Sequence, residues 1–243
     1  MRLIIILLFV VLFLIISLPI QFVEWIIGKL NPDLKTRSSL AIVNWAFRVI
    51  IFFAGTKVTV IGEENVPTDR AVLYIPNHRS YFDIVLTYVR VPRPTGYIAK
   101  KEMERIPSLS QWMRNLHCLF LDRENIKEGL KTILTAIEKI KSGISICIFP
   151  EGTRNTESDE LLPFHDGSFK IAEKSGCPII PVTINNSAAV FEDHLPWIRK
   201  AHVIIEYGSP IEISQLSKEE KRALSQTVRT IISETYKKNK ELV

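Results

Sequence analysis

A histidine and an aspartate five residues apart are the clearest candidates for catalysis in this sequence. His78 follows a short apolar run, and Asp83 lies where a helix is expected to begin. With that local structure the chain can fold back, so that the carboxylate reaches the imidazole. An ionised aspartate on one ring nitrogen fixes the tautomer, and the other nitrogen is then free to take a proton from a hydroxyl group. The spacing therefore predicts a general base and its orienting carboxylate.

A simpler interpretation of the same residues stays open. Ser80 and Asp83 have the spacing of a helix capping box, in which the carboxylate only stabilises the start of a helix. His78 would then be an ordinary loop histidine. The other histidines considered, His117, His194 and His202, lie at a strand start or near a proline-containing loop, and we expect them to be structural.

A second group of residues has the chemistry to bind an anion. Its members follow three further apolar runs, and they are Lys100, Arg123, Glu151, Gly152, Thr153 and Arg154. A glycine lets the backbone approach a ligand, and a guanidinium group binds phosphate through two parallel hydrogen bonds. The alternative is that Arg154 and Glu151 pair with each other or with surface charges, as most such residues do. The helix expected after Phe164 could also present free N–H groups to an anion.

Several other kinds of chemistry lack their sequence patterns. The sequence has no Walker or dinucleotide-binding glycine pattern, no H-E-x-x-H and no G-x-S-x-G, so nothing indicates a nucleotide cofactor, a metal hydrolase or a serine nucleophile. The three cysteines, Cys118, Cys147 and Cys177, are widely spaced among apolar residues. That spacing argues against a disulfide framework and against a zinc site, and it is typical of a reducing compartment.

The chain around these residues alternates short β-branched runs with amphipathic helical stretches. The predicted strands are 57–61, 71–75, 97–99, 118–121, 145–149, 178–184 and 202–207. The predicted helices are 82–89, 108–116, 125–141, 169–174 and 218–238, the last one capped by Ser217. Such alternation predicts an α/β fold with a mostly parallel sheet of about seven strands flanked by helices. Because ligands of open α/β sheets bind beyond the carboxyl ends of the strands, the candidate residues are expected to face one crevice.

The apolar residues of the 243-residue chain are concentrated at its N-terminus. Residues 3–23 carry no charge and are long enough, as a helix, to cross about 30 Å of hydrocarbon. A cleaved signal peptide is the alternative, but Glu24 and Trp25 follow where a small-x-small cleavage site would be expected. A turn at 28–33 and a second apolar segment at 38–54 complete a predicted two-helix membrane motif. We therefore divide the chain into an anchoring motif, 1–55, and an α/β domain, 56–243.

The net charge of +5 suits an anionic partner such as a phosphate-bearing substrate or acidic lipid. No long basic block with interleaved aromatic residues occurs, so nucleic acid is not an expected partner.

Four motifs, in order, resemble those of the glycerolipid acyltransferase family, specifically its bacterial 1-acylglycerol-3-phosphate acyltransferases. The motif N-H-x-x-x-x-D is matched at 77–83, a strand that ends in arginine at 119–123, F-P-E-G-T-R at 149–154, and an apolar run around a proline at 179–184. The resemblance covers roughly residues 57–207. One departure concerns the family's frequent F-K-x-G, which here has His165 in place of the lysine. A cation that assists phosphate binding is therefore in question at that position.

The resemblance implies transfer of a fatty-acyl group in one step, without an acyl-enzyme and without a metal. It implies that His78 acts as general base on the sn-2 hydroxyl of lysophosphatidic acid and that Asp83 orients it. The same resemblance assigns the 3-phosphate to Arg123, Arg154 and Lys100, and the acceptor pocket to Glu151, Gly152 and Thr153. The donor would be a thioester of acyl carrier protein or coenzyme A, and the product phosphatidic acid, for phospholipid biosynthesis at the cell membrane with the catalytic domain facing the cytoplasm.

Two alternative functions accompany this expectation. The acceptor could be glycerol 3-phosphate or a lysophospholipid, in which case the base is the same and the arginines matter less if the phosphomonoester is missing. The protein could instead be a non-catalytic, membrane-bound carrier of anionic lipids. A carrier would tolerate loss of His78 but not of Arg154.

Overall fold

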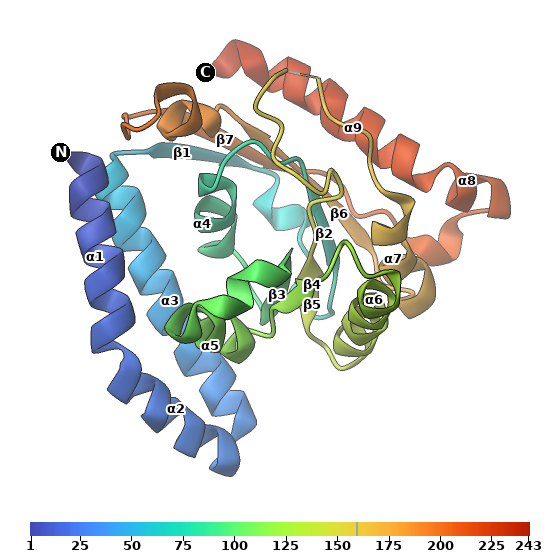
Figure 1. Cartoon of the computed structure of the whole chain (residues 1–243). Helices are drawn as coiled ribbons and strands as arrows, with labels where there is room; N and C mark the ends of the chain where they lie inside the picture. Colours follow the sequence, from blue (N-terminus) through green and yellow to red (C-terminus); the bar gives the residue numbers. More distant parts are fainter. Residues whose placement is uncertain (159) are drawn as a thin grey trace.

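A seven-stranded sheet forms the centre of the protein (Figure 1). The structure is a computed structural model, and it describes residues 1–158 and 160–243. The strands are β1 (Lys57–Ile61), β2 (Leu73–Pro76), β3 (Thr95–Lys100), β4 (Leu119–Leu121), β5 (Ser145–Cys147), β6 (Ile179–Asn185) and β7 (His202–Tyr207). Their order is β1-β7-β6-β2-β5-β3-β4, and every pairing is parallel except that of β6 with β7. The predicted mostly parallel sheet is confirmed.

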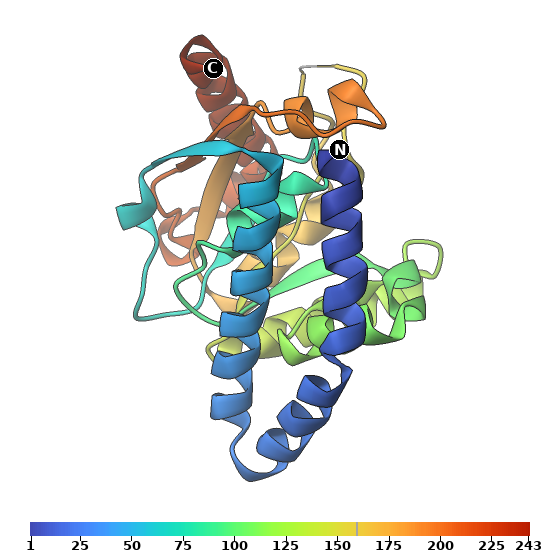
Figure 2. The same ribbon diagram turned by 90° about the vertical axis from the view of Figure 1, so that its left-hand side faces the viewer.

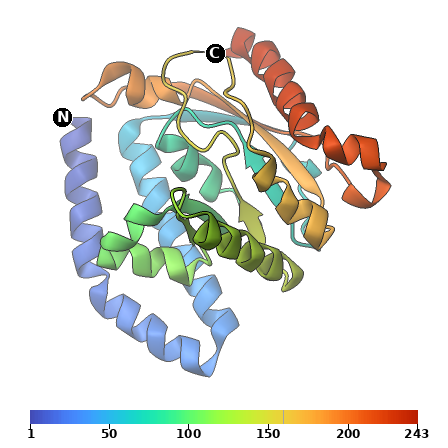
Figure 3. The same ribbon diagram turned by 45° about the vertical axis from the view of Figure 1, so that its right-hand side comes forward.

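Helices cover both faces of this sheet because successive strand residues point to opposite sides. Along β2, Leu73 and Ile75 belong to one apolar cluster and Tyr74 to the other. The cluster that contains Tyr74 is covered by α3 (Pro32–Ala54), α4 (Phe82–Tyr88) and α5 (Pro107–Asn115). The opposite cluster is covered by α6 (Ile126–Lys141), α7 (Lys170–Ser175) and α9 (Leu224–Asn239). Figure 3 shows α6, α7 and α9 on the side turned toward the viewer.

The N-terminal region is a bent pair of helices lying beside α3 (Figure 2). The pair consists of α1 (Arg2–Ile16) and α2 (Leu18–Leu30), which meet at an angle of 48°. Aromatic contacts of Phe9 and Phe13 with Trp45 join α1 to α3. Outward-facing side chains such as Leu8 are half exposed or more. By length and composition α3 could cross a membrane, and so could α1 and α2 if the bent pair forms one span.

The break at Ser17 divides the apolar segment expected over 3–23, in which Pro19 indicates a kink, into two helices. Pro19 has no backbone N–H to continue the ladder of an α-helix, so the chain ends one helix and starts another just before it. The Ser17 hydroxyl accepts a hydrogen bond of 2.9 Å from the indole N–H of Trp112 in α5. The bend is therefore packed against the body of the protein. Apolar helices of this kind are consistent with membrane association.

The C-terminal helix also differs from the sequence prediction. The expected helix over 218–238 is divided into α8 (Lys218–Arg222) and α9, with the break at Ala223. The predicted cap is confirmed, because the Ser217 side chain and the Glu220 side chain each bond the other's backbone N–H.

The helix α3 begins at Pro32, six residues before the expected start at 38, and α2 runs to Leu30, so the expected turn at 28–33 is reduced to Asn31. The remaining strand and helix boundaries differ from the expected ones by one or two residues. The division into an anchoring motif (1–55) and a catalytic domain (56–243) stays a prediction.

Candidate active site

The candidate residues lie at the carboxyl ends of four neighbouring parallel strands. The loops after β2, β5 and β4 carry His78, Glu151 and Arg123 respectively, and Lys100 is the last residue of β3. Parallel neighbours end at the same edge of a sheet, so the predicted common edge is what the topology produces. Along this edge β5 is adjacent to β2. The strand β4 lies three positions from β2, which is about 14 Å at the usual strand spacing.

The imidazole of His78 and the carboxylate of Asp83 are in contact. Nδ1 of His78 lies 2.8 Å from Oδ2 of Asp83, and the aspartate side chain is fully buried. The same oxygen accepts hydrogen bonds from the backbone N–H groups of Arg79 and Ser80, at 2.7 and 2.8 Å. The carboxylate therefore accepts backbone N–H groups of the loop before α4 and also contacts the imidazole, and the role of His78 as a general base stays a prediction. With Nδ1 donating to Asp83, Nε2 is available to accept a proton, and the histidine side chain keeps 14% of its exposure.

Two neighbours from the loop after β5 hold the His78 side chain and its backbone. The ring of Phe149 stacks on the imidazole with centroids 4.0 Å apart. Oε1 of Glu151 accepts the backbone N–H of His78 at 2.7 Å, and Oε2 accepts that of Leu162 at 2.9 Å. Burial raises the pKa of Glu151, and these two N–H donors offset part of the increase. Glu151 thus fixes the backbone of the loop that carries His78, and Phe149 fixes the plane of the imidazole.

Arg154 is held at the site by a residue that the sequence did not indicate. Nη1 of Arg154 donates to Oε1 of Glu192 at 3.0 Å, and its guanidinium carbon lies 3.6 Å from the centre of the Tyr81 ring. The same oxygen of Glu192 accepts the backbone N–H of Tyr81 at 2.9 Å. Among the described residues, Nε and Nη2 of Arg154 have no hydrogen-bond partner. Those two donors form one edge of the guanidinium, the geometry that suits bidentate phosphate contact.

The other predicted anion-binding residues occupy the rest of the loops at this edge. Lys100 and Arg123 are exposed at the ends of β3 and β4, and Thr153 is exposed beside Arg154. Gly152 has a left-handed backbone (φ +71°), and a Cβ at this position would lie 3.1 Å from the ring of His165. The imidazole of His165 therefore lies against the F-P-E-G-T-R loop.

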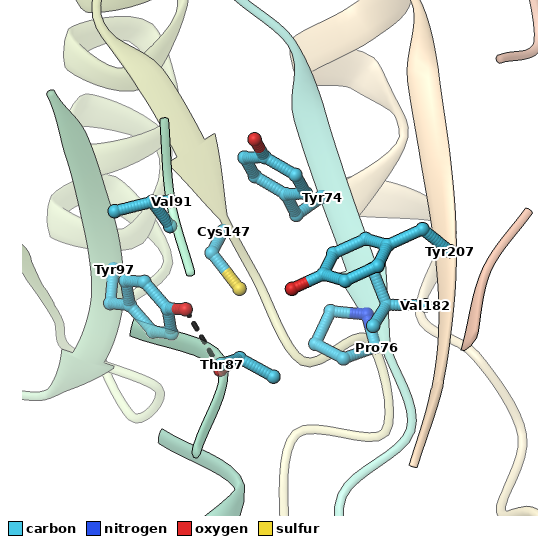
Figure 4. A pocket seen from close by; sticks show the side chains of 8 residues that line it. All are labelled: Tyr74, Pro76, Thr87, Val91, Tyr97, Cys147, Val182 and Tyr207. Atoms are coloured by element: carbon cyan, nitrogen blue, oxygen red, sulfur yellow. Dashed lines mark hydrogen bonds between the residues drawn. The ribbon is translucent and has the colours of Figure 1, made fainter. Parts of the chain in front are cut away.

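A small cavity lies on the α4 side of the sheet, lined by residues that include Pro76 and Thr87 (Figure 4). It has space for about one water molecule. Figure 4 shows the Tyr207 hydroxyl and the Cys147 sulfur pointing toward each other across it. The hydrogen bond between the hydroxyls of Tyr97 and Thr87 forms one wall, and Thr87 in turn donates to the backbone carbonyl of Asp83. These hydrogen bonds connect the wall of the cavity to the backbone of Asp83 in the first turn of α4.

Neither a metal site nor a reactive thiol is found in the part of the chain that the structure describes. No cluster of three or more histidine, cysteine or acidic side chains occurs there in a position to hold a metal ion. The three cysteines are unpaired and buried. Burial raises the pKa of Cys118 and of Cys177 to about 11, so both are protonated at neutral pH.

Comparison with known proteins identifies the class to which this fold and this site belong. The family described as Acyltransferase matches residues 57–185, which include the sheet edge with both halves of the dyad, so the chain belongs to the Acyltransferase family.

Particular relatives narrow the assignment within that family. The chain is 31% identical to the 1-acyl-sn-glycerol-3-phosphate acyltransferase of Borreliella burgdorferi, over 79% of this chain and 77% of the relative. It is 34% identical to the protein of that name from Escherichia coli, over 69% of each. The crystal structure of the 1-acyl-sn-glycerophosphate (LPA) acyltransferase from Thermotoga maritima matches with a TM-score of 0.81 and 25% identity, over 99% of this chain and 98% of that one. The chain is an acyltransferase of the group to which these relatives belong.

Proposed function

We propose that the protein transfers a fatty-acyl group from a thioester of acyl carrier protein or coenzyme A to the sn-2 hydroxyl of 1-acylglycerol 3-phosphate, giving phosphatidic acid. The observation that carries the proposal is the 2.8 Å contact between Nδ1 of His78 and Oδ2 of Asp83, which leaves Nε2 free to act as a base. The names of the relatives support this acceptor and this reaction.

The reaction follows from the two ring nitrogens of His78. Nε2 takes the proton of the acceptor hydroxyl while the hydroxyl oxygen attacks the thioester carbonyl carbon. The C–O ester bond forms, the C–S bond breaks, and the proton on Nε2 passes to the departing thiolate. Asp83 stabilises the imidazolium between these steps through Nδ1–H. No covalent acyl-enzyme and no metal are needed in this sequence.

The acceptor phosphate is assigned to the cations beside the dyad. Arg154 offers the free edge of its guanidinium and is held in place by Glu192. Arg123 and Lys100 come from strands farther along the edge, so they would reach the phosphate with their long side chains. Gly152 and Thr153 shape the loop between base and cation, while Glu151 fixes that loop to His78.

Membrane placement belongs to the same proposal. The outward apolar side chains of α1 and α2 would hold the protein at the cell membrane with the site on the cytoplasmic side, where lysophosphatidic acid and the acyl thioester can meet.

A purified-protein assay with lysophosphatidic acid and each of the two thioesters tests this function. The His78→Ala variant should remain folded and lose about 10²–10⁴-fold in kcat, the usual contribution of a general base. A matched His202→Ala variant removes a histidine whose side chain contacts Thr59 of β1 and has no role in the proposal, and it should turn over like the wild type. Equal turnover by the wild type and His78→Ala would reject the mechanism. Absence of turnover by both proteins, with lipid binding that depends on Arg154, would instead favour the lipid-carrier alternative.

Acceptors without a terminal phosphate separate the remaining alternatives. If Arg154 binds a phosphomonoester, Arg154→Ala should weaken the use of lysophosphatidic acid far more than that of lysophosphatidylcholine. Faster transfer to glycerol 3-phosphate or to the lysophospholipid than to lysophosphatidic acid would instead assign the enzyme to one of those acceptors.

A further inference from the structure

The segment between Phe191 and Ala201 exposes large apolar side chains although both of its ends are anchored in the protein. Leu195 and Trp197 keep 62% and 54% of their exposure. Ile198, which follows Trp197 in the chain, is buried. Backbone hydrogen bonds fix the segment, because Trp197 N–H donates to His194 at 2.7 Å and Arg199 N–H to Val190 at 2.9 Å. The two apolar side chains are therefore held outward by an ordered backbone.

This segment lies beside the N-terminal end of α1 in all three views, where it is coloured orange (Figures 1, 2 and 3). The contacts agree with the pictures. The side chain of Lys200 crosses Gly55, which caps the C-terminal end of α3. Because Phe9 and Phe13 of α1 both contact Trp45 of α3, the start of α1 lies at that same end.

The surroundings at that end are also apolar and outward-facing. Phe52, in the last turn of α3, is 78% exposed, and Ile4, in the first turn of α1, is 66% exposed. With Leu195 and Trp197 they form a set of exposed apolar side chains at one end of the molecule. Large exposed apolar side chains gathered at one end of a molecule indicate a contact with another phase or molecule.

Charge distinguishes a lipid interface from a purely apolar partner. Arg199 and Lys200 are exposed and follow Trp197 after the buried Ile198. Of the acidic residues of the segment, Asp193 is exposed and Glu192 is paired with Arg154, so the exposed part has a net positive charge. Tryptophan with flanking cations is the composition of a membrane–water interface, where the indole lies at headgroup depth and the cations meet phosphates.

We propose that the segment from Leu195 to Lys200 is a second membrane contact, which inserts Leu195 and Trp197 into the headgroup region of an anionic bilayer beside α1. The contact would be separate from the N-terminal helices and would come from the α/β body itself. It does not depend on which acceptor the enzyme uses.

The position of Glu192 gives this contact a consequence for the site. Glu192 lies three residues before Leu195 and holds both Arg154 and the backbone of Tyr81. A bilayer bound at Leu195 would therefore lie next to the arginine that is assigned to the phosphate. The headgroup of a lipid acceptor could then reach the site without leaving the interface.

A fluorescent probe on the full-length protein tests the contact. The native cysteines are buried, so Leu195→Cys can be labelled selectively with an environment-sensitive dye and the protein reconstituted in vesicles of phosphatidylcholine and phosphatidylglycerol. A matched label at Thr135→Cys, exposed on α6 across the sheet, is the control. We expect blue-shifted emission and quenching by headgroup-level spin-labelled lipids at position 195 and neither at 135.

The proposal would be overturned if, in vesicle-bound protein, the dye at position 195 were as hydrated as the dye at position 135 and as weakly quenched. A blue shift that grows with protein concentration in detergent, without quenching of the dye by the lipids, would also overturn it, in favour of a contact between copies of the chain.

A second variant tests the charges. Arg199→Gln combined with Lys200→Gln should make quenching at position 195 less dependent on the phosphatidylglycerol fraction, and an unchanged dependence would remove the two cations from the proposal.

Discussion

Glu192 and Arg154 form an ion pair of 3.0 Å in which the carboxylate keeps 5% of its exposure and the guanidinium 29%. One carboxylate oxygen also accepts the backbone N–H of Tyr81, and the other, Oε2, is buried without a partner in the described part of the chain. A nearly buried carboxylate between a site arginine and the loop of the dyad fixes both. Its negative charge does not favour phosphate, so we interpret its role as positioning.

Substitutions of Glu192 separate position from charge. Glu192→Gln keeps an oxygen for Tyr81 and Arg154, so we expect the KM for lysophosphatidic acid to stay near that of the wild type. Glu192→Ala leaves the guanidinium unsupported and should raise this KM about ten-fold, equivalent to ~1.4 kcal/mol, with a smaller effect on kcat. Steady-state kinetics with varied acceptor measure both. Equal KM values for the two variants would contradict a positioning role.

Asp83→Asn tests the carboxylate of the dyad without removing the loop's hydrogen bonds. The amide oxygen can still accept the N–H groups of Arg79 and Ser80, but an uncharged side chain cannot stabilise the imidazolium. We expect kcat to fall by about 10²–10⁴-fold while the thermal unfolding temperature changes little. Asp69→Asn, at an exposed loop position, is the matched control. An unchanged kcat in Asp83→Asn would mean that the aspartate serves only the start of α4.

Gly152→Ala tests the backbone of the F-P-E-G-T-R loop. A left-handed conformation costs a residue with a Cβ about 1–2 kcal/mol, and here the new methyl group would also press on the ring of His165. For a chain of this length that free energy lowers the unfolding temperature by about 2–8 °C. Gly167→Ala is the control, since a Cβ there meets nothing within 4 Å and the backbone is not left-handed. Equal melting temperatures for the two variants would contradict the strain argument.

The parts of the site that the sequence predicted are those fixed by local spacing. The contact between His78 and Asp83 needs only a strand, a short loop and the first turn of a helix, all of which the residues from 73 to 88 specify. Hydrophobic periodicity likewise predicted the strands and α6, because burial of one face repeats along the chain. The capping pattern at Ser217 was equally local.

The parts that the sequence did not predict depend on contacts between distant segments. Glu192 lies 111 residues after Tyr81 and 38 after Arg154, and no local pattern distinguishes it from a surface glutamate. The stacking of Phe149 on His78 depends on the pairing of β2 with β5, and the order of strands was not predictable from their spacing. The bend at Ser17 is by contrast a local feature, which Pro19 indicates because proline cannot continue the hydrogen bonds of a helix.

His117 links the stability of the protein to pH. Its ring contacts the hydroxyl of Thr36 at 3.1 Å, and burial, followed by the charges of Lys139 and Lys35, lowers its pKa to about 4. A histidine in the unfolded chain has a pKa near 6.5. The unfolded state therefore binds the proton more tightly, so the stabilisation is complete above pH 6.5 and is lost progressively as the pH falls toward 4.

The variant His117→Asn should remove this dependence. Asparagine tolerates the left-handed backbone found at this position (φ 62°), so the substitution does not add strain there. Between pH 7 and pH 4.5 the melting temperature of the wild type should fall more steeply than that of the variant. Lys139→Gln removes one of the charges that lower the pKa, and it should reduce the slope of the wild type without abolishing it. Parallel melting curves for the wild type and His117→Asn would show that other groups cause the acid sensitivity.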